Sequence, residues 1–238
     1  MMGAVTTTKP PEPVTSAPLP ARWGIPDAIG SLLGFVVLSL SVPAALIALG
    51  VDSTTAGIAG VPAGWLSLAG WPLLVSRRRG NGPRTDLAWS FRPIDLGIGA
   101  LGGLVVLVAA EIFTVVYVQI TGATPTSSLG TAASEAQAHW QVIVFAGFAL
   151  CAPFVEELHF RGMWWSALRR RGLGAWPTLV VTAVLFAVVH LEPARVLLLL
   201  AAGLAAGYVR MVTDRLGPAI VTHLLVNAIA VVGLLSLL

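Results

Sequence analysis

Long stretches without a charged side chain recur along this chain. A helix rises 1.5 Å per residue, so about 20 apolar residues cross a hydrocarbon core about 30 Å thick. Only 11% of the residues are charged and 56% are hydrophobic, whereas roughly a quarter of the residues in a soluble domain are charged. The sequence therefore predicts an all-α fold, a polytopic transmembrane helical bundle.

The apolar runs predict about seven spans, at residues 28–50, 55–76, 95–120, 140–168, 175–190, 194–212 and 216–237. The sixth span has the weakest support, because its uncharged core from Val196 to Val209 is 14 residues long. Arg195 or Arg210 must snorkel to complete it, and a half-length re-entrant segment is the alternative.

Basic residues are distributed unevenly between the loops on the two sides. If the N-terminus is cytoplasmic, Arg195 alone lies outside, and the inside receives Lys9, Arg22, Arg77, Arg78, Arg79, Arg84, Arg92, Arg169, Arg170, Arg171, Arg210 and Arg215. Cytoplasmic loops carry such an excess of Lys and Arg, so we expect a multi-pass cell-membrane protein with its N-terminus in the cytoplasm. Because these residues occupy short loops rather than one solvated face, no nucleic-acid partner is expected.

The ends and connectors show no second domain and no repeat. Residues 1–22 are rich in Pro, Thr and Ala and predict a disordered tail. Trp23 is expected to be an interfacial anchor, and Pro26 with Asp27 to mark a helix start. Residues 80–94 are predicted to be a polar cytoplasmic connector.

Charged and polar residues interrupt three of the apolar spans. The fourth span carries Glu156, Glu157 and Arg161; the fifth carries Phe186 and His190; the seventh carries His223 and Asn227. Charged groups at membrane depth are costly and usually face a protein interior or a wet cavity. Counting at 1.5 Å per residue puts the three sets in one broad layer, so the three helices are predicted to converge on one cavity.

Each of these residues also has a purely structural interpretation. Glu157 and Arg161 would neutralise each other as a buried ion pair, and His190 would be an interfacial histidine. His223 and Asn227 would form interhelical hydrogen bonds, which are common in membrane bundles, and Phe186 would pack against the wall of the site. Two acids, one arginine, two histidines and an amide rarely collect by chance in apolar spans, which favours a functional site.

The chemistry of this set predicts a hydrolase that activates water. In a low-dielectric site Glu156 or Glu157 can act as a general base, while Arg161 keeps the other acid ionised and oriented. A histidine can share the proton, and Asn227 beside a second histidine can donate to an oxyanion. Alternatively, Glu156, His190 and His223 hold a divalent metal such as zinc, which lowers the pKa of bound water, although no H-E-x-x-H motif occurs.

Three motifs in this order, Glu156-Glu157-x-x-x-Arg161, Phe186-x-x-x-His190 and His223-x-x-x-Asn227, resemble those of the CAAX-protease and bacteriocin-processing family. This is the CPBP family of type II CAAX prenyl endopeptidases, also called Abi proteins. The resemblance covers residues 140–235, and Trp23-Gly24-Ile25-Pro26-Asp27 also resembles bacterial members.

The resemblance implies a role for each motif residue. Glu156 is then the principal base, Glu157 the partner of Arg161, and His190 an assistant to the base, while His223 and Asn227 steady the oxyanion. Whether zinc takes part is left open by the motifs. We divide the chain accordingly into the tail 1–22, N-terminal transmembrane helices 23–135 and a catalytic core 136–238.

The expected function is an intramembrane endopeptidase that cleaves a membrane-associated protein or peptide. Its substrate is a prenylated protein, a bacteriocin precursor or a regulatory membrane protein, and the Arg-rich, Lys-poor composition is typical of bacterial proteins. A non-proteolytic membrane protein is the alternative, either an immunity factor, a scaffold or a proton-coupled transporter. Transporters place Glu, Arg and His at similar depth, but they commonly show an inverted repeat, which this sequence lacks.

Three further residues have weaker claims to the site. His159 stands three residues after Glu156 and is interpreted as a neighbour that tunes this acid. Cys151, the single cysteine, is expected to be a small buried hydrophobe rather than a nucleophile. Glu111, in the third span, is expected to be a second buried acid and has no assigned role.

Overall fold

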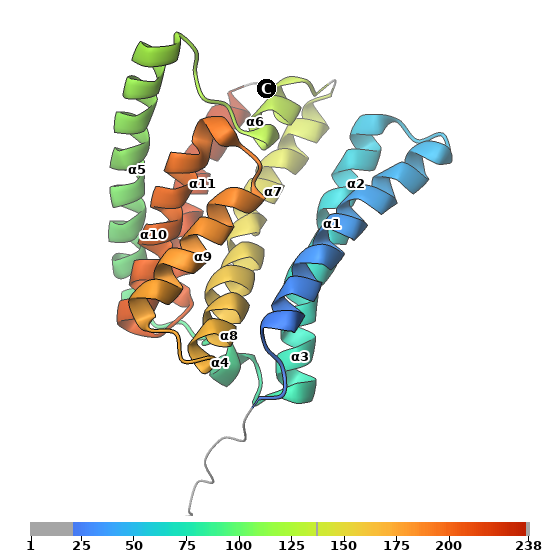
Figure 1. The fold of residues 1–238 in the computed structure, drawn as a ribbon. Helices are drawn as coiled ribbons and strands as arrows, with labels where there is room; N and C mark the ends of the chain where they lie inside the picture. The colour runs from blue at the N-terminus through green and yellow to red at the C-terminus, as the bar shows by residue number, and fades with distance from the viewer. Residues whose placement is uncertain (1–20, 137, 237–238) are drawn as a thin grey trace, which may run out of the picture.

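A computed structural model of the chain describes residues 21–136 and 138–236, and within these residues every regular element is a helix. The predicted tail 1–22 therefore lies outside the described residues, except for its last two. The elements are α1 Ile25–Ala48, α2 Ser53–Trp65, the π-helix η1 Leu66–Gly70, α3 Trp71–Arg79, α4 Pro83–Asp86, α5 Ile94–Thr121, α6 Ser128–Ser134, α7 His139–Glu157, the π-helix η2 Leu158–Trp164, α8 Trp165–Arg170, α9 Ala175–Val189, the 3-10 helix η3 Pro193–Arg195, α10 Val196–Thr213 and α11 Gly217–Leu235 (Figure 1).

Among the described residues, six continuous helical stretches are long and apolar enough to cross a membrane, which agrees with a polytopic bundle. They are residues 25–48, 53–79, 94–121, 139–170, 193–213 and 217–235. The span predicted at 194–212 is thus not a half-length segment, since its helix has 21 residues. The short one is α9, with 15 residues. It ends early because Leu191 takes a positive φ of 54° and Pro193 follows, and neither conformation continues an α-helix.

The first two spans form a hairpin of their own. α1 runs beside α2, and both lie to one side of the other long helices (Figure 1). Glycines allow the close approach: a Cβ on Gly60 would meet Pro43 at 2.6 Å, and one on Gly64 would meet Ser39 at 2.1 Å. Asp52 caps α2 by accepting from the Thr55 N–H at 2.9 Å, and this hydrogen bond lowers the pKa of Asp52.

The remaining long helices pack into a bundle around α7 and α11. α11 packs along α5, where a Cβ on Gly99 would lie 2.4 Å from Val221 and one on Gly103 would lie 2.9 Å from Leu225. α9 and α10 form an antiparallel hairpin in front of them (Figure 1). The residues of the three motifs therefore lie on helices of this second group, except His190, which directly follows the end of α9.

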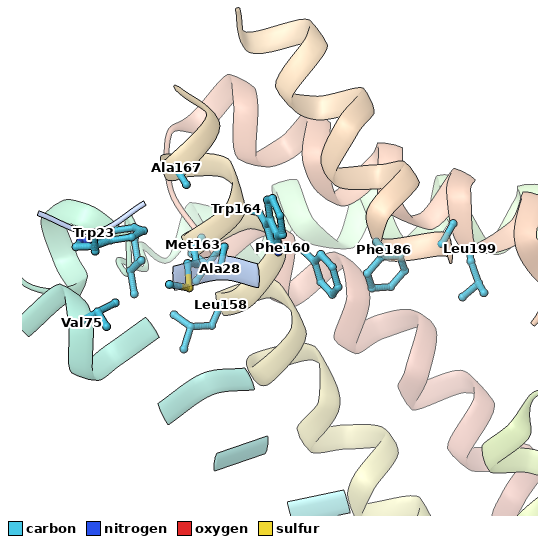
Figure 2. Packing of buried hydrophobic residues seen from close by; sticks show 13 residues of the cluster. Trp23, Ala28, Val75, Leu158, Phe160, Met163, Trp164, Ala167, Phe186 and Leu199 are labelled. Atoms are coloured by element: carbon cyan, nitrogen blue, oxygen red, sulfur yellow. The ribbon is translucent and has the colours of Figure 1, made fainter. Parts of the chain in front are cut away.

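The two groups meet at the core around η2. Leu158, Phe160 and Met163 are at most 1% exposed. Figure 2 shows Met163 and Leu158 near Ala28 of α1, and Phe160 beside Phe186 of α9. The π-helix that directly follows the two glutamates therefore contacts both halves of the molecule.

Two features near the start of the chain are more buried than expected. Trp23 is 5% exposed, because its ring stacks 3.7 Å from the Arg170 guanidinium and its Nε1–H donates to Asp86 at 3.0 Å. Its predicted place at the membrane interface stays a prediction. The connector 80–94 is not simply a polar loop, since it contributes the fully buried Leu87 to the core. Hydrogen bonding thus draws Trp23 and the connector into the bundle.

Candidate functional site

A cavity of about 290 Å³ lies between the helices that carry the motif residues. Glu156, His190, His223 and Asn227 all line it, from α7, the end of α9 and α11. Most of the remaining wall is apolar, and it comes from Val61, Trp65, Val106, Ala110, Leu129, Phe148, Ala149, Ala152, Phe186, Leu198, Leu199, Ala202, Val226, Ala230 and Leu234. The convergence predicted from depth therefore occurs.

One carboxylate oxygen of Glu156 faces both histidines. Glu156 Oε2 lies 3.8 Å from His190 Nε2 and 4.0 Å from His223 Nε2. These distances are too long for direct hydrogen bonds, and the buried Oε2 accepts none from the described residues. A single water molecule can bridge polar atoms separated by such distances.

The hydrogen-bond partner of Nδ1 in each histidine determines which ring nitrogen carries the proton. His190 Nδ1 lies 2.6 Å from the carbonyl oxygen of Phe186, and His223 Nδ1 lies 3.0 Å from Glu157 Oε1. Both partners are acceptors, so both Nδ1 atoms donate, and a neutral ring then presents a lone pair at Nε2. Three acceptors, one carboxylate oxygen and two imidazole nitrogens, thus point at one small volume.

Glu157 has a different environment from its neighbour. Its side chain is 1% exposed, and Oε1 accepts from Arg161 Nη1 at 3.1 Å and from His223 Nδ1 at 3.0 Å. Arg161, also fully buried, donates from Nη2 to the Gly203 carbonyl on α10 at 2.6 Å and stacks 4.8 Å from the Phe186 ring. Glu157 and Arg161 are therefore an ion pair that also orients His223.

Phe186 packs against three of the polar groups. Its ring centroid lies 4.6 Å from that of His190 and 5.5 Å from that of His223, the second edge to face. With Arg161 on the same ring, this one side chain fixes the relative positions of the motifs. The interpretation of Phe186 as packing in the wall of the site agrees with these contacts.

Asn227 is already engaged by a helix of the bundle. Its Nδ2 donates to the Ala149 carbonyl on α7 at 2.8 Å, which ties α11 to α7. Because the amide nitrogen carries two hydrogens, one is committed to this bond and the second remains for a group in the cavity.

Two residues that sequence reasoning did not assign to the site stand at the mouth nearest α6. Glu192 Oε1 accepts from the Ser128 backbone N–H at 2.6 Å, and Glu192 Oε2 accepts from Arg195 Nη1 at 2.6 Å. Glu192, Arg195 and Ser127 all line the cavity. From the sequence, Arg195 was expected to snorkel at the start of the sixth span, and Glu192 was given no role.

The geometry does not fit a zinc site as it stands. Zinc bonds of about 2.0–2.2 Å hold ligand atoms of a tetrahedral site about 3.3 Å apart, and Glu156 Oε2 is farther than this from both histidines. Among the described residues, no group of three His, Cys, Asp or Glu is arranged to hold a metal ion. The side chains would have to close by about half an ångström, so no step below is routed through a metal.

His159 lies outside the cavity and does not tune Glu156. It is fully buried on η2, where Nε2 accepts from Trp164 Nε1–H at 3.0 Å and Nδ1 lies 3.3 Å from Ser31 Oγ of α1. Ser31 Oγ donates to the Ser67 carbonyl at 2.8 Å, and Ser67 Oγ donates to the Ser31 carbonyl at 2.9 Å. His159 therefore joins η2 to the first hairpin and has a structural role.

We expect His159→Phe to lower the free energy of unfolding by about 1–3 kcal/mol, because the buried Trp164 N–H loses its acceptor. Reversible unfolding in lipid bicelles would measure the change. The matched control is His139→Phe, since His139 is exposed on the first turn of α7. Equal stability of the two variants would contradict the role given to the His159 hydrogen bonds.

Cys151 and Glu111 are not where they were expected. Both are exposed on the outside of the bundle, and neither lines the cavity. On α7, Cys151 projects from a different side than Ala149 and Ala152, which face the cavity. On α5, Glu111 adjoins the cavity-lining Ala110, but its own side chain faces outward. Apolar periodicity alone does not reveal which face of a lipid-exposed helix is covered.

Comparison with known proteins gives one family. Residues 138–229 match the family model described as Type II CAAX prenyl endopeptidase Rce1-like. Searches of curated proteins and of solved structures give no match to this chain. The matched segment begins just before α7 and ends within α11, so it contains all three motifs.

Proposed function

The chain belongs, through residues 138–229, to the Rce1-like family of type II CAAX prenyl endopeptidases, and we propose that it cleaves its substrate with water activated by Glu156 and His190. The family supports a CAAX-type intramembrane protease in general terms. The roles of individual residues rest on the geometry of the cavity.

One observation carries the proposal. Glu156 Oε2 and the Nε2 atoms of His190 and His223 are three acceptors around one small volume, separated by 3.8 and 4.0 Å. Acceptors that converge without a donor between them are electrostatically unfavourable. A water molecule there donates both of its protons to these acceptors, and its oxygen lone pairs then face the cavity.

Hydrolysis follows from this arrangement. As the water oxygen attacks the carbonyl carbon of the scissile bond, its proton passes to Glu156, with His190 as the second acceptor. The carbonyl oxygen becomes an oxyanion in the tetrahedral intermediate. When the C–N bond breaks, the proton held by Glu156 or His190 passes to the leaving amine, and the carboxylic acid product departs.

Two groups are assigned to the oxyanion. The second N–H of Asn227 faces the cavity, because the first is committed to Ala149. His223 is an acceptor at Nε2 until Glu156, whose Oε2 lies 4.0 Å away, passes it the proton taken from the water. It then donates from Nε2 to the oxyanion, with Glu157 as its partner at Nδ1, and returns this proton through Glu156 when the C–N bond breaks. Donors held in place before the reaction stabilise the developing charge without reorganisation.

The substrate class follows from the lining of the cavity. Its wall is mostly apolar, and its polar atoms come from the motif residues, Ser127 and the Glu192–Arg195 pair. Such a wall suits an apolar segment of a membrane-associated protein or peptide. The excess of Arg at the α3–α4 and α8–α9 end of the bundle supports an orientation with the N-terminus in the cytoplasm.

We expect His190→Ala to lower the cleavage rate about 100-fold with little change in KM, because the imidazole acts on the water rather than on bound substrate. Proteoliposomes and a fluorogenic farnesylated CAAX peptide would measure this. His139→Ala, at an exposed position, is the matched control. A His190→Ala enzyme as fast as this control would remove His190 from the mechanism.

The same proteoliposomes separate the metal-free mechanism from the zinc alternative. We expect cleavage to survive dialysis against a chelator, and metal content to be the same in wild type and His190→Ala. Loss of activity on dialysis, restored by zinc, would replace the mechanism above. Comparison of protein N-termini in membranes holding wild type or the His190→Ala variant would then identify the native substrate.

A further inference from the structure

Arg210 connects the end of α10 to the helix that carries the two glutamates. Its side chain is 4% exposed, and Nε donates to the backbone carbonyl of Arg161 in η2 at 3.2 Å. Nη1 donates to Asp214 at 2.6 Å, and the guanidinium carbon lies 5.3 Å from the Trp165 ring centroid. None of the three motifs includes this arginine.

A second arginine makes the reciprocal contact. Arg161 in η2 donates from Nη2 to the Gly203 carbonyl of α10 at 2.6 Å, while Arg210 of α10 donates to the Arg161 carbonyl. Gly203 and Arg210 lie seven residues apart, two turns along one face of α10. The two hydrogen bonds join Arg161 of η2 to two points on α10 and so hold this residue in position against α10.

α10 is in turn fixed to the helix that presents His190. A Cβ on Gly203 would lie 3.0 Å from the Ala183 Cα of α9, and one on Gly207 would lie 3.2 Å from Leu179. Backbones packed this closely move together. The path from η2 through Arg210 and α10 to α9 is therefore a second link between the helices of Glu156 and His190. It stands beside the direct contacts of Phe186 with Phe160 and Arg161.

We propose that Arg210 is a positioning residue for the catalytic site, which holds η2 so that Glu156 and His190 share one water. It touches neither substrate nor the reacting atoms, since it does not line the catalytic cavity. Instead it lines a separate cavity of about 470 Å³ at the other end of η2, together with Trp165, Arg169 and Asp214. This inference rests on the proposed function, because it assigns Arg210 a role in that reaction.

We expect Arg210→Gln to lower kcat by about 10- to 100-fold with KM changed less than about twofold, since small displacements of catalytic groups cost rates of this order. Arg210→Lys is expected to fall short of wild type as well, because one ammonium cannot reproduce the two bonds of a planar guanidinium. The farnesylated CAAX peptide in proteoliposomes serves as the substrate.

Two control variants share the surroundings of Arg210. Asp214→Asn removes the negative charge opposite Nη1 and keeps the Nε bond to η2, and Asn tolerates the positive φ of 52° at this position. Arg169→Gln removes an exposed arginine from the same cavity. Both controls are expected to keep wild-type kcat within about twofold, since neither touches the Arg161 carbonyl.

Two further measurements separate positioning from general instability. Hydrogen exchange of the amides in 158–164 is expected to accelerate about tenfold or more in Arg210→Gln and not in Asp214→Asn. Ethylguanidinium added to Arg210→Ala is expected to enter the 470 Å³ cavity and restore part of kcat, and to restore nothing in a Glu156→Gln enzyme.

The outcomes are distinguishable. Wild-type kcat in Arg210→Gln, or unchanged exchange in η2, would overturn the inference. Faster exchange throughout the chain would also overturn it, because Arg210 would then support only the fold. If wild type shows no Glu156-dependent cleavage, the proposed function itself is wrong, and the inference falls with it, whatever the exchange data show.

Discussion

Glu156→Gln is expected to lower the rate of peptide cleavage at least about 1,000-fold, with the substrate still bound. Glutamine has the shape of glutamate but cannot accept the proton of the attacking water. Glu156 Oε2 is the one atom that faces both His190 Nε2 and His223 Nε2, so no neighbouring carboxylate takes over. Single-turnover cleavage of the farnesylated peptide in proteoliposomes would measure the chemical step separately from product release.

The control for this substitution is Glu157→Gln, the same change one residue along the helix. Glu157 Oε1 already accepts from Arg161 and His223, so its loss is expected to act mainly on stability and on the orientation of His223. Glu156→Gln should therefore be the slower enzyme of the two and as stable as wild type. The assignment of Glu156 as the base would be wrong if Glu156→Gln cleaved the peptide at the wild-type rate.

Arg161→Met is expected to lower the free energy of unfolding by about 3–5 kcal/mol, the usual cost of leaving one partner of a buried ion pair without the other. Arg161 and Glu157 are both buried and 3.1 Å apart, and the Gly203 carbonyl also loses its donor. Unfolding by steric trapping in bicelles would measure the change.

The double variant Glu157→Leu with Arg161→Met tests the cause of that loss. Removing both charges leaves no uncompensated ion, so the double variant should be more stable than Arg161→Met alone. The contrary result is a double variant that loses as much stability as the single variants Glu157→Leu and Arg161→Met lose together. That result would show that packing, and not charge, dominates at this site.

The sequence predicted the helical class and the convergence of the three motifs, for a clear physical reason. Charges such as Glu157 and Arg161 are costly in lipid, so the clustered charges of the three motifs indicated the interior of the bundle, whereas the isolated Glu111 faces outward. The ion pair of Glu157 with Arg161 and the packing role of Phe186 follow from four-residue spacing on one helical face. These features depend on local chemistry, which a sequence displays directly.

Other features depend on tertiary contacts and could not be predicted in this way. Trp23 is buried only because Arg170 and Asp86, distant in sequence, meet its ring. Glu111 and Cys151 lie on outward faces that hydropathy does not distinguish from inward ones. The π-helical turn at η2 could not be predicted from its residues either, because the same residue types also form α-helices.

The short α9 affects the membrane around the protein. Its 15 residues rise about 22 Å, about 8 Å less than the mean hydrocarbon thickness, and a bilayer adapts to a short helix by thinning beside it. His190 stands directly after the last turn of this helix. We expect lipid headgroups and their hydration water to be drawn towards His190, which leaves less hydrocarbon for water to cross before it reaches the reacting bond.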